Sequence, residues 1–299
     1  MTGDLVDRIV EAVLYEGYVL YPYRPSAVKN RQRWTFGAIY PRTFSEYQGG
    51  TDAWTMQTEC LVRGGEDTRL DVQVRCLHVV ARTIGELLEP LGPPTNDDEP
   101  RYRPVPSLRV DGRLYQSWDE AVERVVGVGE RRLGDLVARA CRVPVSVPAG
   151  RSVEPLRDAS GVAAGVAVRE HDLLEGEVVV TAQPVGAGLF RVAVRVDNTA
   201  PCAIEDLGDR ERALRRTFVA THPILRATGG ELLSLTDPPE DAREEAAACR
   251  NAGTWPVLVG EPGSHNTLLS SPIILEDYPQ IAQESPGSLY DGTEIDEIL

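Results

Sequence analysis

The residues of this sequence that could act as a nucleophile, a base or a metal ligand are its five cysteines and four histidines. Cys76 and His78 are the closest such pair in the chain, and residues i and i+2 of a strand point to the same side. Cys76 also belongs to the apolar series of its segment, so we interpret it as a small core residue. Cys249 ends an expected helix and has no base nearby. The sequence contains no GxSxG motif either, so nucleophilic catalysis is not indicated.

The spacing of the histidines does not indicate a metal site. No two of them lie within one helical turn, and the sequence contains neither an HExxH motif nor a CxxC pair. His171 and Asp172, with His222, could form a site assembled from distant parts of the chain, but many globular proteins contain such residues. The glycines at 127–129 and 161–165 do not match a phosphate-binding loop. We therefore expect no metal and no cofactor.

A basic and aromatic segment from Gly17 to Ser45 is the first unusual feature. It contains five cations and no acid, and seven aromatic residues lie among the cations. Its prolines favour an irregular segment or short edge strands. Tyr, Trp and Arg are enriched at the hot spots of protein interfaces, so the segment is a candidate docking surface. Its candidate interaction residues are Tyr21, Tyr23, Arg24, Lys29, Arg31, Arg33, Trp34 and Arg42.

The end of the chain has the opposite charge. After Arg250 there is no lysine or arginine, but there are eight acids. The acidic tail could pack on the basic segment within one molecule, or one of the two could form a docking surface. The sequence leaves both interpretations open. Asp277 and Tyr278 are the candidate interaction residues of this stretch.

The overall charge and composition argue against several classes of function. The formal net charge is −15 at pH 7, and such a surface repels nucleic-acid phosphates and anionic lipids, so we expect neither nucleic acid nor a membrane as a partner. No run of about 18 apolar residues that could span a bilayer is present. The first residues include acids and no basic region, which predicts no signal peptide. Five widely spaced cysteines do not suggest a disulfide framework, and we expect a cytoplasmic protein.

Strand signals dominate the elements that must position these residues. The segment 70–80 alternates apolar with polar residues, which is typical of a half-buried strand, and segment 54–62 precedes it across a predicted turn at 64–67. The clearest hairpin pairs 177–185 with 189–198 through a three-residue loop that contains glycine. Further strands are expected at 213–226, 256–260 and 271–275.

Fewer segments carry helix signals. Apolar residues at helical spacing predict an amphipathic helix at 4–16. The capping-box spacing that begins at Ser117 predicts a short helix through Val126. Prolines at the start of residues 237–250 predict a helix there. Residues 132–147 are compatible with either helix or strand.

Many strands, few helices and hairpin-like connections predict an α+β, strand-rich fold. We expect an antiparallel sheet or sandwich-like core with a few peripheral helices. Residues 1–299 are expected to form a single globular unit. The segment 90–106 contains six prolines and an acidic run, which indicate an exposed loop, and a subdivision there would give units at 1–89 and 107–299.

Four strings of the sequence together resemble an uncharacterised actinobacterial protein family that is encoded alongside high-affinity nickel–iron hydrogenases. They are YPYRPSAVKNRQRWTFG (21–37), DAWTMQTECLVRG (52–64), ATHPIL (220–225) and SSPIILEDYPQIAQESPGSLYDGTEIDEIL (270–299). The resemblance runs along most of the chain. It implies an accessory role in the maturation or scaffolding of a hydrogenase, and it assigns no catalytic residue. Family members continue past Leu299, so this chain is expected to be a shortened form that stops inside a helix beginning near Thr293.

The sequence therefore favours a non-catalytic binding or assembly protein whose partner is a protein, either a hydrogenase subunit or a second copy of the chain. One alternative is an enzyme of unknown class with a site assembled from distant residues, such as His171, Asp172 and His222. Another is a homo-oligomeric structural protein that pairs its basic and acidic ends between copies. Salt would weaken such an oligomer, because it screens exposed charges.

Overall fold

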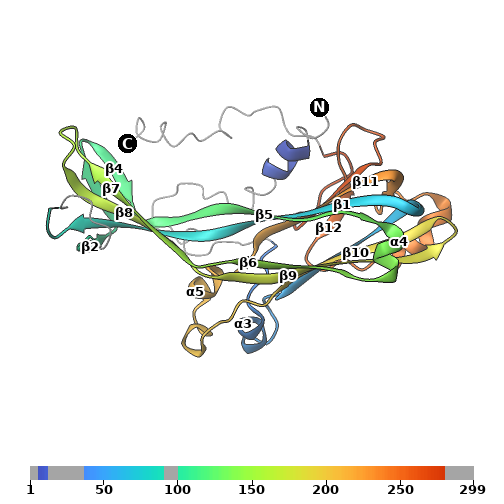
Figure 1. The fold of residues 1–299 in the computed structure, drawn as a ribbon, viewed down its shortest axis with the longest axis horizontal. Coiled ribbons are helices and arrows are strands. Elements are labelled where there is room, and N and C mark those ends of the chain that lie inside the picture. Colours follow the sequence, from blue (N-terminus) through green and yellow to red (C-terminus); the bar gives the residue numbers. More distant parts are fainter. Residues whose placement is uncertain (1–5, 13–36, 91–99, 280–299) are drawn as a thin grey trace.

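The computed structural model describes residues 6–12, 37–90 and 100–279, and this part of the chain is built mainly of antiparallel strands (Figure 1). The strands are β1 (Thr55–Leu87), β2 (Tyr102–Val105), β3 (Ser107–Val110), β4 (Arg113–Gln116), β5 (Trp118–Arg132), β6 (Cys141–Val147), β7 (Gly150–Arg157), β8 (Ala163–His171), β9 (Leu174–Gly186), β10 (Leu189–Asn198), β11 (Val219–Leu233), β12 (Trp255–Leu258) and β13 (Thr267–Ser271). The helices are a segment at 6–12, α3 (Arg42–Tyr47), α4 (Leu133–Ala138), α5 (Arg210–Leu214) and α6 (Arg243–Ala247), with short 3-10 turns η1 (Ile204–Asp206) and η2 (Glu240–Ala242). The predicted strand-rich fold with an antiparallel sheet and few helices is confirmed.

Strand β1 is the centre of the main sheet, whose order is β12-β13-β11-β1-β10-β9-β6. One edge of β1 pairs first with β10, then with β5 and finally with β2. The opposite edge pairs with β11 and then with β8, which in turn pairs with β7. The short hairpin of β3 and β4 forms a sheet of its own. Because β5, β8, β10 and β11 all follow the segment 90–106, one sheet joins the parts of the chain on either side of it.

The main sheet is folded over at a bulge in β1. Gly64 pairs with Gly230, but the next pair along the two strands is Arg69 with Thr228, so the four residues 65–68 lie opposite the single residue Gly229. The chain therefore turns back where the sequence predicts a turn at 64–67, although β1 stays one continuous strand because β11 bends together with it: Thr55–Arg63 pair with β10 in one layer and Arg69–Arg82 pair with β5 in the other. A bulge of this kind bends a strand. In Figure 1, β1 and β5 lie above β6 and β9, which gives two layers.

The largest hydrophobic core lies between these layers. Leu70, Val72, Val74 and Cys76 of β1 all face it, as the alternation of the sequence predicts. Inward valines of β9 and β10 cover it from the other layer. Each fully buried aliphatic side chain of this kind contributes about 1.5–3 kcal/mol to stability.

Strand β5 replaces the helix that the capping-box spacing predicts from Ser117 to Val126. The Ser117 hydroxyl does not cap a helix; it accepts a hydrogen bond from Ile84 N at 2.8 Å and donates to Val105 O at 2.7 Å. The whole segment pairs with β1. Long-range strand pairing therefore overrides the local capping signal, so this prediction was wrong.

The hairpin of β9 and β10 is confirmed, and it closes at Gly186 and Leu189. The strand predicted at 213–226 is partly right, because α5 ends at Leu214 and β11 begins only at Val219. The ambiguous segment 132–147 contains both α4 and β6.

The remaining predicted elements differ mainly in their bounds. The helix predicted at 237–250 is short and is made of η2 and α6. Strand β12 lies where 256–260 predicts it, whereas β13 lies ahead of 271–275. Residues 6–12 of the predicted N-terminal helix are helical, and they pack through Val6, Ile9 and Val10 on the outer strands of the sheet.

The molecule is elongated, and one end of it forms a narrow arm. The arm consists of β2, β3, β4, β7 and β8 with the last part of β1, at the left of Figure 1. Its own small core is made of four buried side chains, Ile84, Val110, Leu156 and Ala167. Across the described ranges, the helices are all too short or too polar to cross a bilayer.

Candidate functional site

Seven of the ten interaction residues predicted from the sequence lie outside the described residues. They are Tyr21, Tyr23, Arg24, Lys29, Arg31, Arg33 and Trp34. The structure places the other three, Arg42, Asp277 and Tyr278.

Arg42 begins α3, directly after Pro41, and its side chain is exposed. Its Nε donates to Glu46 Oε1 at 2.7 Å, one helical turn away. Its guanidinium also lies 4.7 Å from the centre of the Trp54 ring. This cation–π contact holds an arginine and an indole together at the surface, where a partner could bury both.

Helix α3 packs beside η1 and α5, below the sheets in Figure 1. Gln48 Nε2 donates to Leu207 O at 3.1 Å, which ties the end of α3 to the turn that leads into α5. Two large apolar side chains are exposed on these elements, Tyr47 at 64% and Ile204 at 86%. We call Arg42, Tyr47, Trp54, Ile204 and Arg210 the α3–α5 surface.

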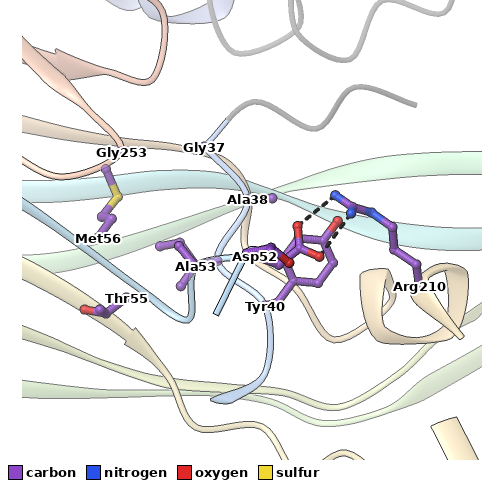
Figure 2. Close-up of a pocket in the computed structure, with 11 residues that line it drawn as sticks. Gly37, Ala38, Tyr40, Asp52, Ala53, Thr55, Met56, Arg210 and Gly253 are labelled. Carbon is purple, nitrogen blue, oxygen red and sulfur yellow. Dashed lines mark hydrogen bonds and ion pairs between the residues drawn. The ribbon is translucent and has the colours of Figure 1, made fainter. Parts of the chain in front are cut away.

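A hollow of about 200 Å³ opens beside this surface (Figure 2). Arg210 closes one side of it, with an ion pair to Asp52 at 3.0 Å and with its guanidinium 5.0 Å from the centre of the Tyr40 ring. The hollow is smaller than typical small-molecule pockets of about 300–1,000 Å³, so its size suits one side chain of a partner better than a substrate. Its lining residues are Gly37, Ala38, Ile39, Tyr40, Thr51, Asp52, Ala53, Thr55, Met56, Arg210 and Gly253.

Two rings at the described end of the aromatic segment are core residues. Tyr40 and Phe44 are stacked, with ring centres 5.3 Å apart, and both are buried with Leu77 and Val79 of β1. These rings are therefore not available to a partner. Of the candidate docking residues that the sequence predicts in this segment, Arg42 is the one that the structure describes, and its side chain is exposed.

Asp277 and Tyr278 fasten the C-terminal stretch to the body of the protein. Asp277 accepts hydrogen bonds from Leu258 N at 2.8 Å and from the Ser234 hydroxyl at 2.5 Å. The Tyr278 hydroxyl donates to Ser264 O at 3.0 Å, and burial raises the pKa of Tyr278. Between the described residues no contact joins this pair to Arg42, so the structure does not bring the three candidates together.

The two strand cysteines are insulated from chemistry. Cys60 and Cys76 are fully buried in the core. Burial raises the pKa of Cys76 to about 12 and raises the pKa of Cys60 as well. A thiol with such a pKa is almost entirely protonated at neutral pH and is a poor nucleophile. The structure thus supports the interpretation of Cys76 as a core residue.

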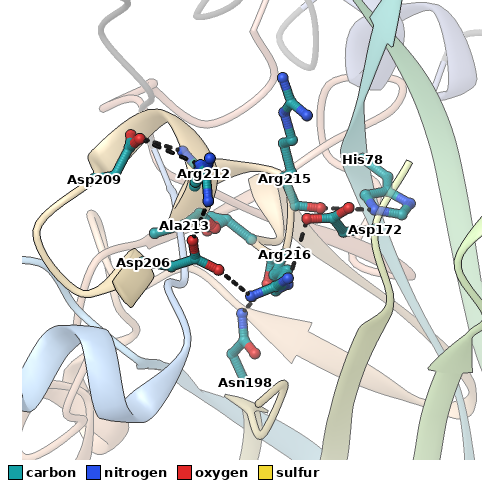
Figure 3. A network of polar contacts seen from close by, with 10 residues as sticks. His78, Asp172, Asn198, Asp206, Asp209, Arg212, Ala213, Arg215 and Arg216 are labelled. Carbon is teal, nitrogen blue, oxygen red and sulfur yellow. Dashed lines mark hydrogen bonds and ion pairs between the residues drawn. The ribbon is translucent and has the colours of Figure 1, made fainter. Parts of the chain in front are cut away.

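Asp172 belongs to a polar network with His78 and Arg216 (Figure 3), and His171 lies against His78, but His222 lies elsewhere. The ring of His171 lies edge-on to the ring of His78, with centres 5.2 Å apart. Asp172 forms an ion pair with Arg216 at 3.4 Å. His222 pairs instead with Arg75 in the register of β1 and β11, on the face of β1 away from His78.

The same network ties the connection between β10 and β11 to the core. Asp206 is buried and accepts from Arg212 at 2.8 Å and from Arg216 at 3.1 Å. The Asn198 amide donates to Ile39 O at 2.7 Å and to Arg216 O at 2.8 Å. Sequence reasoning missed this network, because His78, Asn198 and Arg216 are brought together only by strand register.

A site for a metal ion would need three or more His, Cys, Asp or Glu side chains close together. The described part of the chain contains no such group.

The comparisons with known proteins do not assign this chain to a family. No model of a known protein family matches the chain, and no curated protein is significantly similar to it.

Proposed function

We propose that this chain is a non-catalytic binding or assembly protein and that it docks a protein partner through the α3–α5 surface. The observation that carries the proposal is the set of exposed Arg42, Tyr47 and Ile204 with half-buried Trp54, next to a small hollow that Arg210 lines. Arginine, tyrosine and tryptophan supply most hot-spot energy in protein interfaces. Ile204 is 86% exposed, so its apolar side chain is in contact with water. Burying it against a partner would stabilise the complex.

The partner that we propose is a subunit of a nickel–iron hydrogenase, during its maturation or scaffolding. The support for this partner is the resemblance of four strings of the sequence to a family encoded beside such enzymes. The formal net charge is −15 at pH 7. Such a charge would attract a partner with a basic patch over a long range. All five cysteines are free, which supports a place in the reducing cytoplasm.

The first experiment compares two isoleucine substitutions that differ only in location. Ile204→Asp puts a charge in the centre of the α3–α5 surface, whereas Ile274→Asp puts the same charge at another exposed site, where the side chain is 73% exposed. Proteins that copurify from the native host are identified by mass spectrometry, and the affinity of the purified pair is then measured. We expect Ile204→Asp to weaken binding by about tenfold or more, the effect of one hot-spot residue.

The matched variant separates the surface from the partner. Equal affinity of Ile204→Asp and Ile274→Asp would reject the α3–α5 surface as the dock. Recovery of a second copy of the chain, or of a protein other than a hydrogenase subunit, would reject the proposed partner and leave the surface to be tested against the protein recovered.

A further inference from the structure

The inner face of the sheet changes from apolar to polar partway along β1 and β5. Val74 and Val126 lie opposite each other and both pack in the core. The next pair on this face is Cys76 with Arg124, and His78 follows Cys76 on the same side. Residues directly opposite each other in an antiparallel pair share a face. The side chains of Arg124 and His78 therefore project from the same face of the sheet that carries the core.

Arg124 has no counter-ion among the residues that the structure describes. Its Nε is buried and has no hydrogen-bond partner, and the described residues form no ion pair with its guanidinium. A partly buried charge without a partner is costly, and buried polar atoms in folded proteins are nearly always hydrogen-bonded. An orphaned cationic donor of this kind points to a group that binds there.

Two carboxylates on or beside this face, Glu120 and Asp172, are already engaged. Glu120 accepts from Arg82 at 3.0 Å and from Arg169 at 2.8 Å. Asp172 lies 3.4 Å from the Nε of Arg216. Each carboxylate is thus matched by at least one arginine, so the positive charge of Arg124 is left over.

His78 supplies the second orphaned atom. Its Nε2 lies 3.0 Å from the carbonyl oxygen of Arg215, which can only accept, so Nε2 carries the proton. Burial is the main cause that lowers the pKa of His78 to about 4, with Arg124 as a further contributor, so the ring is neutral at pH 7. Within the described part of the chain, the buried Nδ1 has no partner and is an unused acceptor.

We propose that Arg124 and His78 bind a small oxyanion that also carries a hydroxyl group. The oxyanion accepts the hydrogen bond of Arg124 Nε, and the hydroxyl donates to His78 Nδ1. Hydrogen phosphate and 2-hydroxycarboxylates share this chemistry. Val122 lies opposite His78 in the register and is 41% exposed, so solvent reaches this face next to His78, while His78 itself and the two orphaned atoms are buried.

The ligand test uses four anions in two matched pairs. Inorganic phosphate and sulfate are similar in shape, but at pH 7 only phosphate carries a hydroxyl; glycolate and acetate differ in the same way. Each is titrated into the purified full chain by calorimetry. We expect the hydroxyl-bearing member to bind about tenfold more tightly or better, the effect of one hydrogen bond that is otherwise left unsatisfied. If phosphate is the tightest ligand of the four, the oxyanion is a phosphate; if glycolate is the tightest, it is a 2-hydroxycarboxylate.

The titrations can also overturn the proposal. Binding of none of the four anions would reject the site. Equal binding within both pairs would reject the role of the His78 acceptor.

The residue test compares two arginines of β5. Arg124→Gln is expected to weaken binding of the hydroxyl-bearing anion by about tenfold or more, because a charge-assisted hydrogen bond is lost. Arg131→Gln is the control, because Arg131 is exposed and contacts only Glu130 O among the described residues. Unchanged binding by Arg124→Gln would remove Arg124 from the site.

A third variant separates binding from a structural role of Arg124. In the absence of anion, Arg124→Leu is expected to keep or raise the midpoint of urea unfolding, because it removes a partly buried charge that has no partner among the described residues. Phosphate or glycolate should then no longer raise that midpoint, although it does so for the wild-type chain. A large loss of stability in the anion-free variant would show that Arg124 serves the fold and would overturn the proposal.

Discussion

His78 and His222 are the two histidines that lie in the interior, and their environments determine their charge. Burial lowers the pKa of His78 and of His222 to about 4 from the ordinary value of 6.5. The His222 Nδ1 lies 2.5 Å from Ala220 O, and its buried Nε2 has no partner among the described residues. Both rings are therefore neutral in the folded protein and become charged once the chain unfolds at mildly acidic pH.

This difference predicts a pH dependence of stability. Between pH 6.5 and about pH 4 the unfolded chain binds more protons than the folded one, so the free energy of unfolding falls as the pH is lowered. Each histidine accounts for a loss on the order of 3 kcal/mol, complete below the folded pKa. Urea unfolding at a series of pH values measures the slope.

Glutamine variants isolate the histidine contribution from that of the carboxylates. His222→Gln is expected to flatten the slope between pH 6.5 and 4.5, because it removes one titrating group. The control is His265→Gln, whose ring is exposed. A His222→Gln protein with the full wild-type slope would contradict the prediction.

At the scale of the elements, strand pairing determines which local signals matter. Ser117 has the spacing of a helix cap, yet β5 pairs with β1 along the whole segment. Pro144 and Pro256 lie in β6 and β12, the two outermost strands of the main sheet path, whereas Pro184 and Pro223 lie in the inner strands β9 and β11. An edge strand needs its N–H groups on one side only, so proline is tolerated there.

Gly176 of β9 is a place where two elements approach closely. A Cβ atom at this position would lie 2.5 Å from Asp197 O and 2.6 Å from the Phe218 ring. We expect Gly176→Ala to lower the free energy of unfolding by about 1–3 kcal/mol, as overpacked core substitutions do. Urea unfolding with a fluorescence readout measures the loss.

Gly127 of β5 offers the matched control. A Cβ atom there would meet nothing within 4 Å, and the backbone is not in the left-handed region. Gly127→Ala should therefore stay within about 0.5 kcal/mol of the wild-type stability. Equal losses for the two variants would mean that the close approach at Gly176 is not what requires glycine.

At the scale of the whole molecule, the arm and the body differ in how much apolar surface they bury. The arm core contains four buried side chains, whereas the body core continues through β1, β5, β9, β10 and β11. Local opening is easiest where few buried contacts must be broken. The arm is thus the part of the described molecule that should open first.

Hydrogen exchange measures this difference directly. At neutral pH the amides of β7, β3 and β4 should exchange before those of β9 and β10, which pair with each other inside the body. The β9–β10 hairpin serves as the internal reference, and mass spectrometry of peptides gives both rates in one experiment. Equal protection of β7 and β9 would show that the arm and the body open as one unit.

The sequence by itself determined the strand-rich class, the hairpin of β9 and β10 and the inward face of β1 from Leu70 to Cys76. Those features follow from local alternation and turn residues, which act over a few positions. Only the tertiary structure decided that the segment after Ser117 is a strand and that Arg124 lies opposite Cys76, on the same face of the sheet as His78. The physical reason is strand register, which sets neighbours that are far apart in the chain and leaves no periodic signal in either segment.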